Sequence, residues 1–228
     1  MILVQYYNNY IIFKGAYIMN FKNDKVCDFV AKLSSHSAVP GGGGAAALTA
    51  ALSSALSSMV FNLTVGKKSY DALSEDIKAM VNSALLKCEN MNMEFQDYIS
   101  KDGEAFSALM EAYKLPKDSV EHAEFRETKI QEELNKAMDV PFSLAKEIIV
   151  LFENIDIAAQ YGNKNVISDA GVSAILAYAA VESCVLNVKV NLKFINNNDD
   201  VMMDKCSELL KAAKQYKDII MEKVYSKI

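Results

Sequence analysis

One carboxylate occupies a helical position at which the neighbouring residues are apolar. The residues that share this face are Phe95, Ile99, Asp102, Phe106, Leu109 and Tyr113. Their spacing of three and four residues is that of one side of a helix. An unpaired ionised carboxylate is costly to bury, and burial raises its pKa toward values useful for proton transfer. The pattern makes Asp102 a candidate catalytic residue, the alternative being a salt bridge to a lysine on a neighbouring helix.

A proline and four glycines precede a long uncharged segment. They are Pro40, Gly41, Gly42, Gly43 and Gly44. Glycine allows a close approach of the backbone, and a helix that starts here exposes amide donors at its positive end. The run matches neither of the common glycine-rich nucleotide motifs. We interpret it as the centre of a site for a polar or anionic ligand, with a crowded turn between two helices as the alternative.

Three further polar residues could contact such a ligand. Asn187 and Asn191 lie one helical turn apart in an apolar segment, where amide groups need partners across a helix interface or on a ligand. His36 lies in the loop before the glycines. It could polarise a ligand or only form local hydrogen bonds.

Charged residues near predicted helix ends are weaker candidates. Lys67 and Lys68 follow the uncharged segment, and Lys114 and Lys117 flank a Leu-Pro pair. They could meet substrate carboxylates, although a solvated surface role is the simpler interpretation. Asp169 stands at a predicted helix start, where a carboxylate interacts with the helix dipole or serves a ligand site.

The composition argues against metal and nucleic-acid binding. The candidate soft ligands are Cys27, Cys88, Cys184, Cys206, His36 and His122, and they include no C-x-x-C pair. We therefore predict reduced thiols in the cytoplasm and no metal site. A net charge of −5 without a basic stripe is atypical of proteins that bind nucleic-acid phosphates.

Helical periodicity dominates the chain. Apolar residues recur every three or four positions over 24–34, 45–65, 70–113, 118–160 and 169–194, and a final helix follows the polar turn 196–200. Pro141 is expected to kink or divide its helix near Asp139, and Ser168 to cap the next one. We find no strand-like alternation bounded by turns. The sequence predicts an all-α, antiparallel multi-helix bundle.

Residues 45–65 carry no charge and are long enough to cross a membrane. A leucine-rich stripe runs along this segment, but Ser53, Ser54 and Ser57 interrupt the remaining surface. A helix facing lipid would carry bulky residues all round. We therefore predict a central helix of a soluble bundle, with close helix contacts on its small-residue faces and no membrane partner.

The N-terminus differs from the rest of the chain. Residues 1–20 are apolar and aromatic, without the basic start and small-residue cleavage site of a secretory signal. We treat them as an extension, which a later translation start at Met19 would explain. Residues 21–228 are expected to form a single domain, since a chain of 228 residues is short for several large domains.

Several short motifs together carry a family resemblance. They are Ser37 to Gly43, Met59-Val60, Gly66-Lys67-Lys68, Asp102 to Phe106, Leu115-Pro116-Lys117, Val140-Pro141, Gly162-Asn163, Ser168-Asp169, Asn187-Val188 and Asn191-Leu192. Over about residues 24–228 the chain resembles the cyclodeaminase and methenyltetrahydrofolate cyclohydrolase family, which includes the C-terminal domain of formiminotransferase-cyclodeaminase. The chain departs from the family pattern at Gly44, Glu182 and Ser183.

The resemblance implies an all-helical enzyme, dimeric or built from dimers, that needs no metal or redox cofactor. Its substrates would be one-carbon derivatives of tetrahydrofolate, and Asp102 matches the family's catalytic aspartate. The first hypothesis is hydrolysis of 5,10-methenyltetrahydrofolate to 10-formyltetrahydrofolate, with Asp102 accepting a proton from water. The glycine turn, Asn187 and Asn191 would orient the pterin or benzoyl group, and the lysines would meet the glutamate tail.

Two alternatives remain open at this stage. The first is cyclodeamination of formiminotetrahydrofolate with release of ammonia, which the same aspartate could serve. The second is a folate-binding or dimerising helical module without catalysis, which gives no reason for a carboxylate on the apolar stripe. The sequence shows no companion formiminotransferase domain, and this favours the cyclohydrolase by association.

Overall fold

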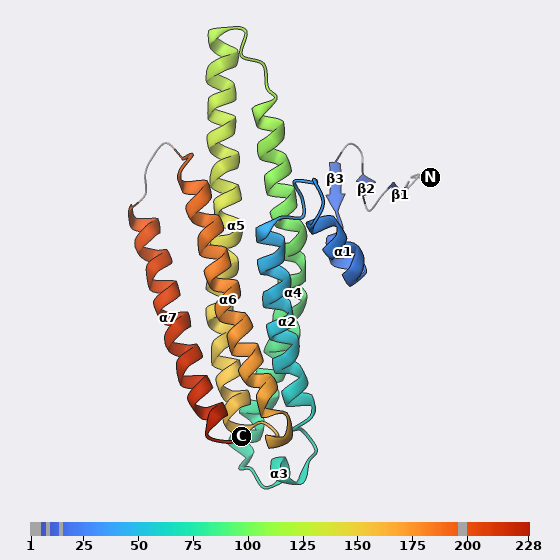
Figure 1. The fold of residues 1–228 in the computed structure, drawn as a ribbon, viewed down its shortest axis with the longest axis vertical. Coiled ribbons are helices and arrows are strands. Elements are labelled where there is room, and N and C mark those ends of the chain that lie inside the picture. Colours follow the sequence, from blue (N-terminus) through green and yellow to red (C-terminus); the bar gives the residue numbers. More distant parts are fainter. Residues whose placement is uncertain (1–5, 8–9, 14–15, 196–199) are drawn as a thin grey trace.

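Five long helices form the body of the part of the chain that the structure describes (Figure 1). The computed structural model describes residues 6–7, 10–13, 16–195 and 200–228. The long helices are α2 (Gly42–Asn62), α4 (Glu75–Tyr113), α5 (Val120–Tyr161), α6 (Ile167–Leu192) and α7 (Asp200–Tyr225). Helices α2, α4, α5 and α6 form an antiparallel ring in which each packs on two neighbours, and α7 packs on α5 and α6. The predicted antiparallel helical bundle is confirmed.

Short helical elements flank or connect the long helices. They are α1 (Val26–Leu33), α3 (Lys68–Asp71) and the 3-10 turns η1 (Phe21–Asn23) and η2 (Lys164–Val166). Helix α1 and the loop after it lead into the N-terminus of α2 (Figure 1). The α1 periodicity is as predicted, but only Phe29 of its apolar face is buried, while Val26 is 80% exposed.

A small antiparallel sheet precedes the helices, so the prediction of no strands was wrong for this segment. It contains β1 (Tyr6–Tyr7), β2 (Tyr10–Phe13) and β3 (Ala16–Met19) in that order, and β3 contacts α4. Tyr10 pairs with Met19 and Ile11 with Ile18. Aromatic and β-branched residues favour strands, but pairing with a neighbouring strand decides whether one forms. A search for alternation within one segment misses that pairing.

Two helix starts differ from the prediction. The helix expected from residue 70 begins at Glu75, because residues 68–71 form the separate helix α3 and Ser74 occupies the N-cap position. Ser168 does not cap α6: η2 leads directly into the helix, so Val166 is the N-cap and Ser168 lies in the first turn. Of the turn predicted over 196–200, residues 196–199 lie outside the described part.

Helix α5 continues through Pro141, so the predicted division near Asp139 does not occur. Proline has no N–H and therefore cannot bond the carbonyl four residues earlier, which is that of Ala137. The Nδ2 of Asn191, on α6, donates to this carbonyl at 3.0 Å. A side chain of a neighbouring helix thus replaces the missing backbone bond.

Small residues, rather than leucines, form the buried side of α2. The buried positions of this helix include Ala46, Ala47, Ala50, Ser53, Ser54 and Ser57. Leu52, on the leucine-rich stripe, is 51% exposed. Small side chains let α2 approach α4 and α6 closely, as predicted. Within the described residues, α2 and the segment Lys164–Leu192 are long and apolar enough to cross a membrane, and at least half of each apolar window is buried in the bundle.

Hydroxyl groups join α2 to α6 in the centre of the bundle. Ser53 Oγ donates to the Ser173 carbonyl at 2.9 Å, and Ser173 Oγ donates to the Ser53 carbonyl at 2.8 Å. Ser57 Oγ lies 2.8 Å from Ser173 Oγ. All three side chains are fully buried. In this serine cluster, Ser53, Ser57 and Ser173, each buried hydroxyl therefore has a hydrogen-bond partner within the bundle, where water cannot supply one.

Replacing Ser173 by Ala is expected to lower the free energy of unfolding by about 1–3 kcal/mol, because it leaves the buried Ser57 hydroxyl without this partner. Urea denaturation followed by circular dichroism measures the loss. Ser207→Ala is the matched control, since Ser207 is exposed and bonds only within α7, and a change below about 0.5 kcal/mol is expected there. Equal stabilities for the two variants would contradict this account of the serine cluster.

Candidate active site

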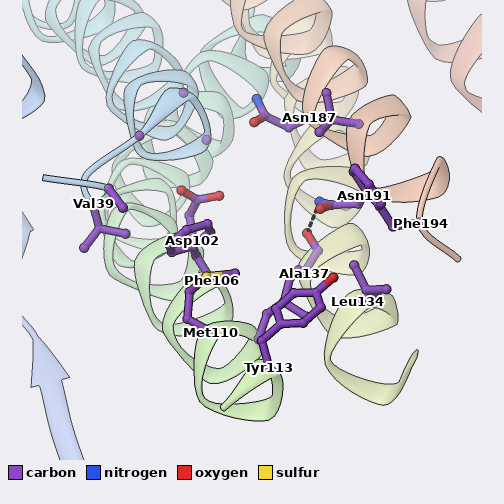
Figure 2. Close-up of a pocket in the computed structure, with 16 residues that line it drawn as sticks. Val39, Asp102, Phe106, Met110, Tyr113, Leu134, Ala137, Asn187, Asn191 and Phe194 are labelled. Atoms are coloured by element: carbon purple, nitrogen blue, oxygen red, sulfur yellow. Dashed lines mark hydrogen bonds between the residues drawn. The ribbon is translucent and has the colours of Figure 1, made fainter. Parts of the chain in front are cut away.

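A cavity of about 440 Å³ opens near the N-terminus of α2 (Figure 2). Its walls come from the loop before α2, the first turn of α2, and the helices α4, α5 and α6. This volume falls within the range of small-molecule sites, which run from about 300 to 1,000 Å³. Gly41, Gly42, Gly43, Asp102, Asn187 and Asn191, all predicted from the sequence as ligand-site residues, line the cavity. Segments far apart in sequence therefore meet here.

Asp102 approaches the N-terminus of α2 from α4 (Figure 2). Its Oδ2 accepts a hydrogen bond of 3.0 Å from the backbone N–H of Gly44. A Cβ on Gly43 would overlap the carboxylate, whereas one on Gly44 would make ordinary contacts at 3.5 Å or more. Only a glycine at position 43 lets the carboxylate come this close. Gly43 is thus the glycine of the run that the placement of Asp102 needs.

The Asp102 carboxylate has no cationic partner in the described part of the chain. No lysine or arginine there lies within ion-pair distance of it, so the salt bridge considered as an alternative is not formed. The neighbouring Lys101 instead places its Nζ 4.3 Å from the ring centroid of Tyr98. Burial raises the pKa of Asp102 above its ordinary value, and the Gly44 N–H partly offsets this shift. A raised pKa makes the ionised carboxylate a stronger proton acceptor, as a general base requires.

The cysteine behind Asp102 is a poor nucleophile. Cys184 is fully buried on α6. Burial, and then the charge of Asp102, raise the pKa of its thiol to about 12. Because the thiolate is the reactive form, Cys184 is a packing residue at neutral pH.

The two asparagines hold their amide nitrogens on backbone carbonyls. Asn187 Nδ2 donates to the Ser183 carbonyl at 2.8 Å, within α6. Asn191 Nδ2 donates to the carbonyl of Ala137 on the neighbouring helix α5, and Ala137 also lines the cavity (Figure 2). Neither Oδ1 accepts a hydrogen bond from a described residue. Both side chains therefore bring unused acceptors to the cavity wall.

The part of the cavity beyond Asp102 is apolar and aromatic. Phe106 and Tyr113 continue the stripe of Asp102 along α4, as the sequence predicted. The lining residues that sequence reasoning did not single out for the site are Ala38, Val39, Met110, Leu134, Ala137, Val190 and Phe194. Phe194 could have been found, because it continues the spacing of Asn187 and Asn191 in the turn just past the end of α6. Nothing in the local sequence of α5 marked Leu134.

Several predicted site residues do not reach the cavity. Lys67 and Lys68 lie past the opposite end of α2, about 30 Å from Gly43 at 1.5 Å of rise per residue. Asp169 lies in the first turn of α6, about 27 Å along the helix from Asn187. His36 is exposed in the loop before α2 and is absent from the lining.

Pro40, Lys114 and Lys117 are also outside the cavity lining. Pro40 is buried under the first turn of α2, where it packs near Gly44. Lys114, in an ion pair with Glu111 at 2.6 Å, and Lys117 are exposed past the end of α4.

Over the described part of the chain, no cluster of three His, Cys, Asp or Glu side chains could hold a metal ion.

Sequence comparison decides the family. The family model described as formiminotransferase-cyclodeaminase matches residues 25–212. The chain belongs to this family. The methenyltetrahydrofolate cyclohydrolase of Methylorubrum extorquens is 39% identical over 208 residues, which cover 90% of this chain and 98% of that protein. The resemblance found from the motifs is thus confirmed, as is the assignment to a family of folate enzymes.

Other members of the formiminotransferase-cyclodeaminase family are similar over nearly the same region. The formimidoyltransferase-cyclodeaminase of Mus musculus is 33% identical over 197 residues, which cover 85% of this chain but 35% of that protein. The crystal structure of formiminotetrahydrofolate cyclodeaminase from Thermotoga maritima matches with a TM-score of 0.73 and 27% identity, covering 90% of this chain and 96% of that one.

Proposed function

We propose that this protein hydrolyses 5,10-methenyltetrahydrofolate to 10-formyltetrahydrofolate. The observation that carries the proposal is the unpaired Asp102 carboxylate, the one carboxylate among the described residues that line the cavity. The substrate is a cationic amidinium, which an unpaired carboxylate in a largely apolar site stabilises. The M. extorquens relative carries this activity in its name and matches over 98% of its length.

The reaction needs one group that accepts and returns a proton. Water adds to the carbon between N5 and N10 while Asp102 takes one of its protons. The C–N5 bond of the resulting tetrahedral carbon then breaks, N5 receives the proton from Asp102, and the hydroxyl becomes the formyl C=O as its proton passes to solvent. No oxidation state changes, so the step requires no redox cofactor, and we propose that no metal takes part.

The other cavity groups would orient the substrate. The N–H groups of Gly42 and Gly43 precede the first intrahelical bond of α2, from Ala45 N–H to Gly41 O, and such groups favour developing negative charge on oxygen. The aromatic walls at Phe106 and Phe194 suit the pterin and benzoyl rings. A role of Lys67 and Lys68 in holding the glutamate tail would require a second chain.

An assay with two substrates tests the reaction. Hydrolysis of methenyltetrahydrofolate is followed by the loss of its ultraviolet absorbance, and deamination of formiminotetrahydrofolate by the release of ammonia. We expect the first to be turned over with the higher kcat/KM. Turnover of neither substrate would overturn both reactions and leave a non-catalytic folate-binding or dimerising module.

Cyclodeamination is the second candidate. The observation that favours it is the likeness to the T. maritima structure, whose name states that activity, over 96% of that chain. There, N10 would attack the formimino carbon, and Asp102 would carry the proton from N10 to the departing ammonia. A higher kcat/KM for formiminotetrahydrofolate would place the chain in this class of ammonia lyases.

The raised pKa of Asp102 predicts the acid limb of the pH–rate profile. Because the proposed base is the ionised form, kcat/KM falls as pH drops through the pKa of Asp102. That pKa is raised by burial, so the midpoint lies above the ordinary value of about 3.9. Initial rates measured across this range provide the test. A limb at or below the ordinary value would contradict the role of the buried carboxylate.

We further propose a cytoplasmic homodimer. Outward-facing apolar residues on the adjacent helices α2 and α6 support a subunit interface: Leu52, Met59, Leu63, Val172, Ile175 and Leu186 are each at least 38% exposed. Exposed apolar residues that gather on neighbouring helices are a feature of protein–protein interaction sites. The four cysteines are unpaired, which suits a reducing compartment. Sedimentation equilibrium of the intact chain gives the subunit number directly.

A further inference from the structure

Pro141 and Asn191 form a matched pair across the interface of α5 and α6. A residue at position 141 with an amide N–H would bond the Ala137 carbonyl, and proline cannot. The Asn191 side chain supplies that bond from the other helix at 3.0 Å. The pair therefore holds the Asn191 amide in one orientation at the cavity wall.

This orientation determines which atom of Asn191 is available to a ligand. With Nδ2 held by Ala137, the Oδ1 has no described partner, and both residues line the cavity. Asn187 is held in the same sense by the Ser183 carbonyl. Together with the Asp102 carboxylate, two amide oxygens make this part of the wall a set of hydrogen-bond acceptors.

A wall of acceptors suits a ligand that presents N–H donors. The pyrimidine ring of a reduced pterin carries such donors on its amino group and ring nitrogens. An asparagine free to rotate could offer either its NH2 or its oxygen, and would lose rotamer entropy on binding. Because Nδ2 is already bound to the Ala137 carbonyl, Asn191 offers only its oxygen to the ligand. The side chain also loses less rotamer entropy when the ligand binds.

We propose that Pro141 is a positioning residue for substrate binding. By removing a backbone N–H, it makes Ala137 recruit the Asn191 amide and leaves Asn191 Oδ1 to accept an N–H of the pterin. This inference rests on the proposed folate substrate. It assigns Pro141 a role that acts through Asn191, without contact with the substrate.

Two single variants test the pair with 5-formyltetrahydrofolate as a stable probe, its Kd measured by calorimetry. Asn191→Leu loses the acceptor, and we expect Kd to rise about tenfold, the equivalent of one hydrogen bond. Pro141→Ala gives Ala137 a backbone donor and releases Asn191, so Kd should rise about three- to tenfold while the melting temperature does not fall. KM should follow Kd, with kcat within about twofold of wild type.

The double variant separates positioning from a general structural effect. In Asn191→Leu the Ala137 carbonyl has neither donor, so this variant should melt at a lower temperature than the wild type. Adding Pro141→Ala should restore the melting temperature and leave Kd at the value of Asn191→Leu. In the double variant the residue 141 N–H bonds the Ala137 carbonyl. The double variant can therefore be measured in place of Asn191→Leu if that single variant fails to fold. Asn82→Leu, an exposed change near the far end of α4, is the control and should leave Kd unchanged.

Each outcome decides one part of the proposal. Wild-type Kd in Asn191→Leu would overturn the acceptor role of Asn191. Wild-type Kd in Pro141→Ala, or a further rise in Kd in the double variant, would overturn positioning by Pro141. If the wild type turns over its substrate and the variants keep the wild-type Kd, only the role of Pro141 and Asn191 is contradicted. If the variants differ in Kd but no protein shows turnover, only the proposed reaction is contradicted. If the wild type does not bind the probe, both are contradicted.

Discussion

Asp102→Asn is expected to lower kcat for methenyltetrahydrofolate by about 10²- to 10⁴-fold, the usual contribution of a positioned general base. The amide has nearly the same shape, and its oxygen can still accept the Gly44 N–H that Asp102 binds. What it cannot do is take a proton from water or neutralise the amidinium. Initial rates at saturating substrate measure the loss, and circular dichroism should show unchanged helix content.

The same variant should not be less stable than the wild type at neutral pH. Because the folded state raises the pKa of Asp102, the folded protein binds more protons than the unfolded chain between the ordinary and the raised pKa. Its free energy of unfolding therefore falls as pH rises through that window. At any pH above the raised pKa, the buried carboxylate is charged and the protein keeps this loss of stability. The Asp102→Asn substitution removes this cost. Asp97→Asn, at an exposed ion pair on the same helix, is the control and should keep full activity. Retained turnover in Asp102→Asn would show that another group is the general base.

Gly43→Ala is expected to lower kcat/KM by about 100-fold or more. The added methyl group would overlap the Asp102 carboxylate, so either the side chain or the first turn of α2 must move. Displacement of a reacting group by about 1 Å can cost this much in rate. Steady-state kinetics with methenyltetrahydrofolate, together with a melting curve to confirm folding, measure the effect.

The adjacent glycine provides a matched control. A Cβ on Gly44 would meet Pro40 and Ile99 only at ordinary contact distances of 3.5 Å and beyond. Gly44→Ala keeps the backbone N–H that bonds Asp102 and gains up to about 1 kcal/mol of helix propensity. Most activity should therefore remain. Equal losses in the two variants, or none in either, would show that the close approach of Asp102 to Gly43 is not what the chemistry needs.

The periodicity of the chain was sufficient to predict the helices but not the details that depend on contacts between them. Three- and four-residue spacing placed Asp102 on the face of Phe106 and Tyr113, and all three line the cavity. The same spacing placed the leucines of the 45–65 segment on one stripe, but it did not show which stripe is buried, and Leu52 is half exposed. Helix periodicity shows which residues share a face, and only the neighbouring helices decide which face is covered.

Charge and local motifs predicted some of the residues at the cavity correctly and others wrongly. Gly43, Asn187 and Asn191 reach the cavity, whereas Lys67 and Asp169 lie at the opposite end of the bundle. Motif membership does not state where along a helix a residue sits relative to residues on other helices. In an antiparallel bundle, successive motifs alternate between the two ends, so only some of them can meet at one site.

The sequence by itself determined the helical class, the family and the candidate carboxylate, because these depend on spacing along one chain segment and on short motifs. The tertiary structure alone decided that Asp102 has no cationic partner among the described residues, and that Gly43 must lack a side chain to admit it. It also decided that Asn191 replaces the bond missing at Pro141. Each of these depends on atoms of different helices within a few ångströms of one another, a distance that no pattern within a single helix specifies.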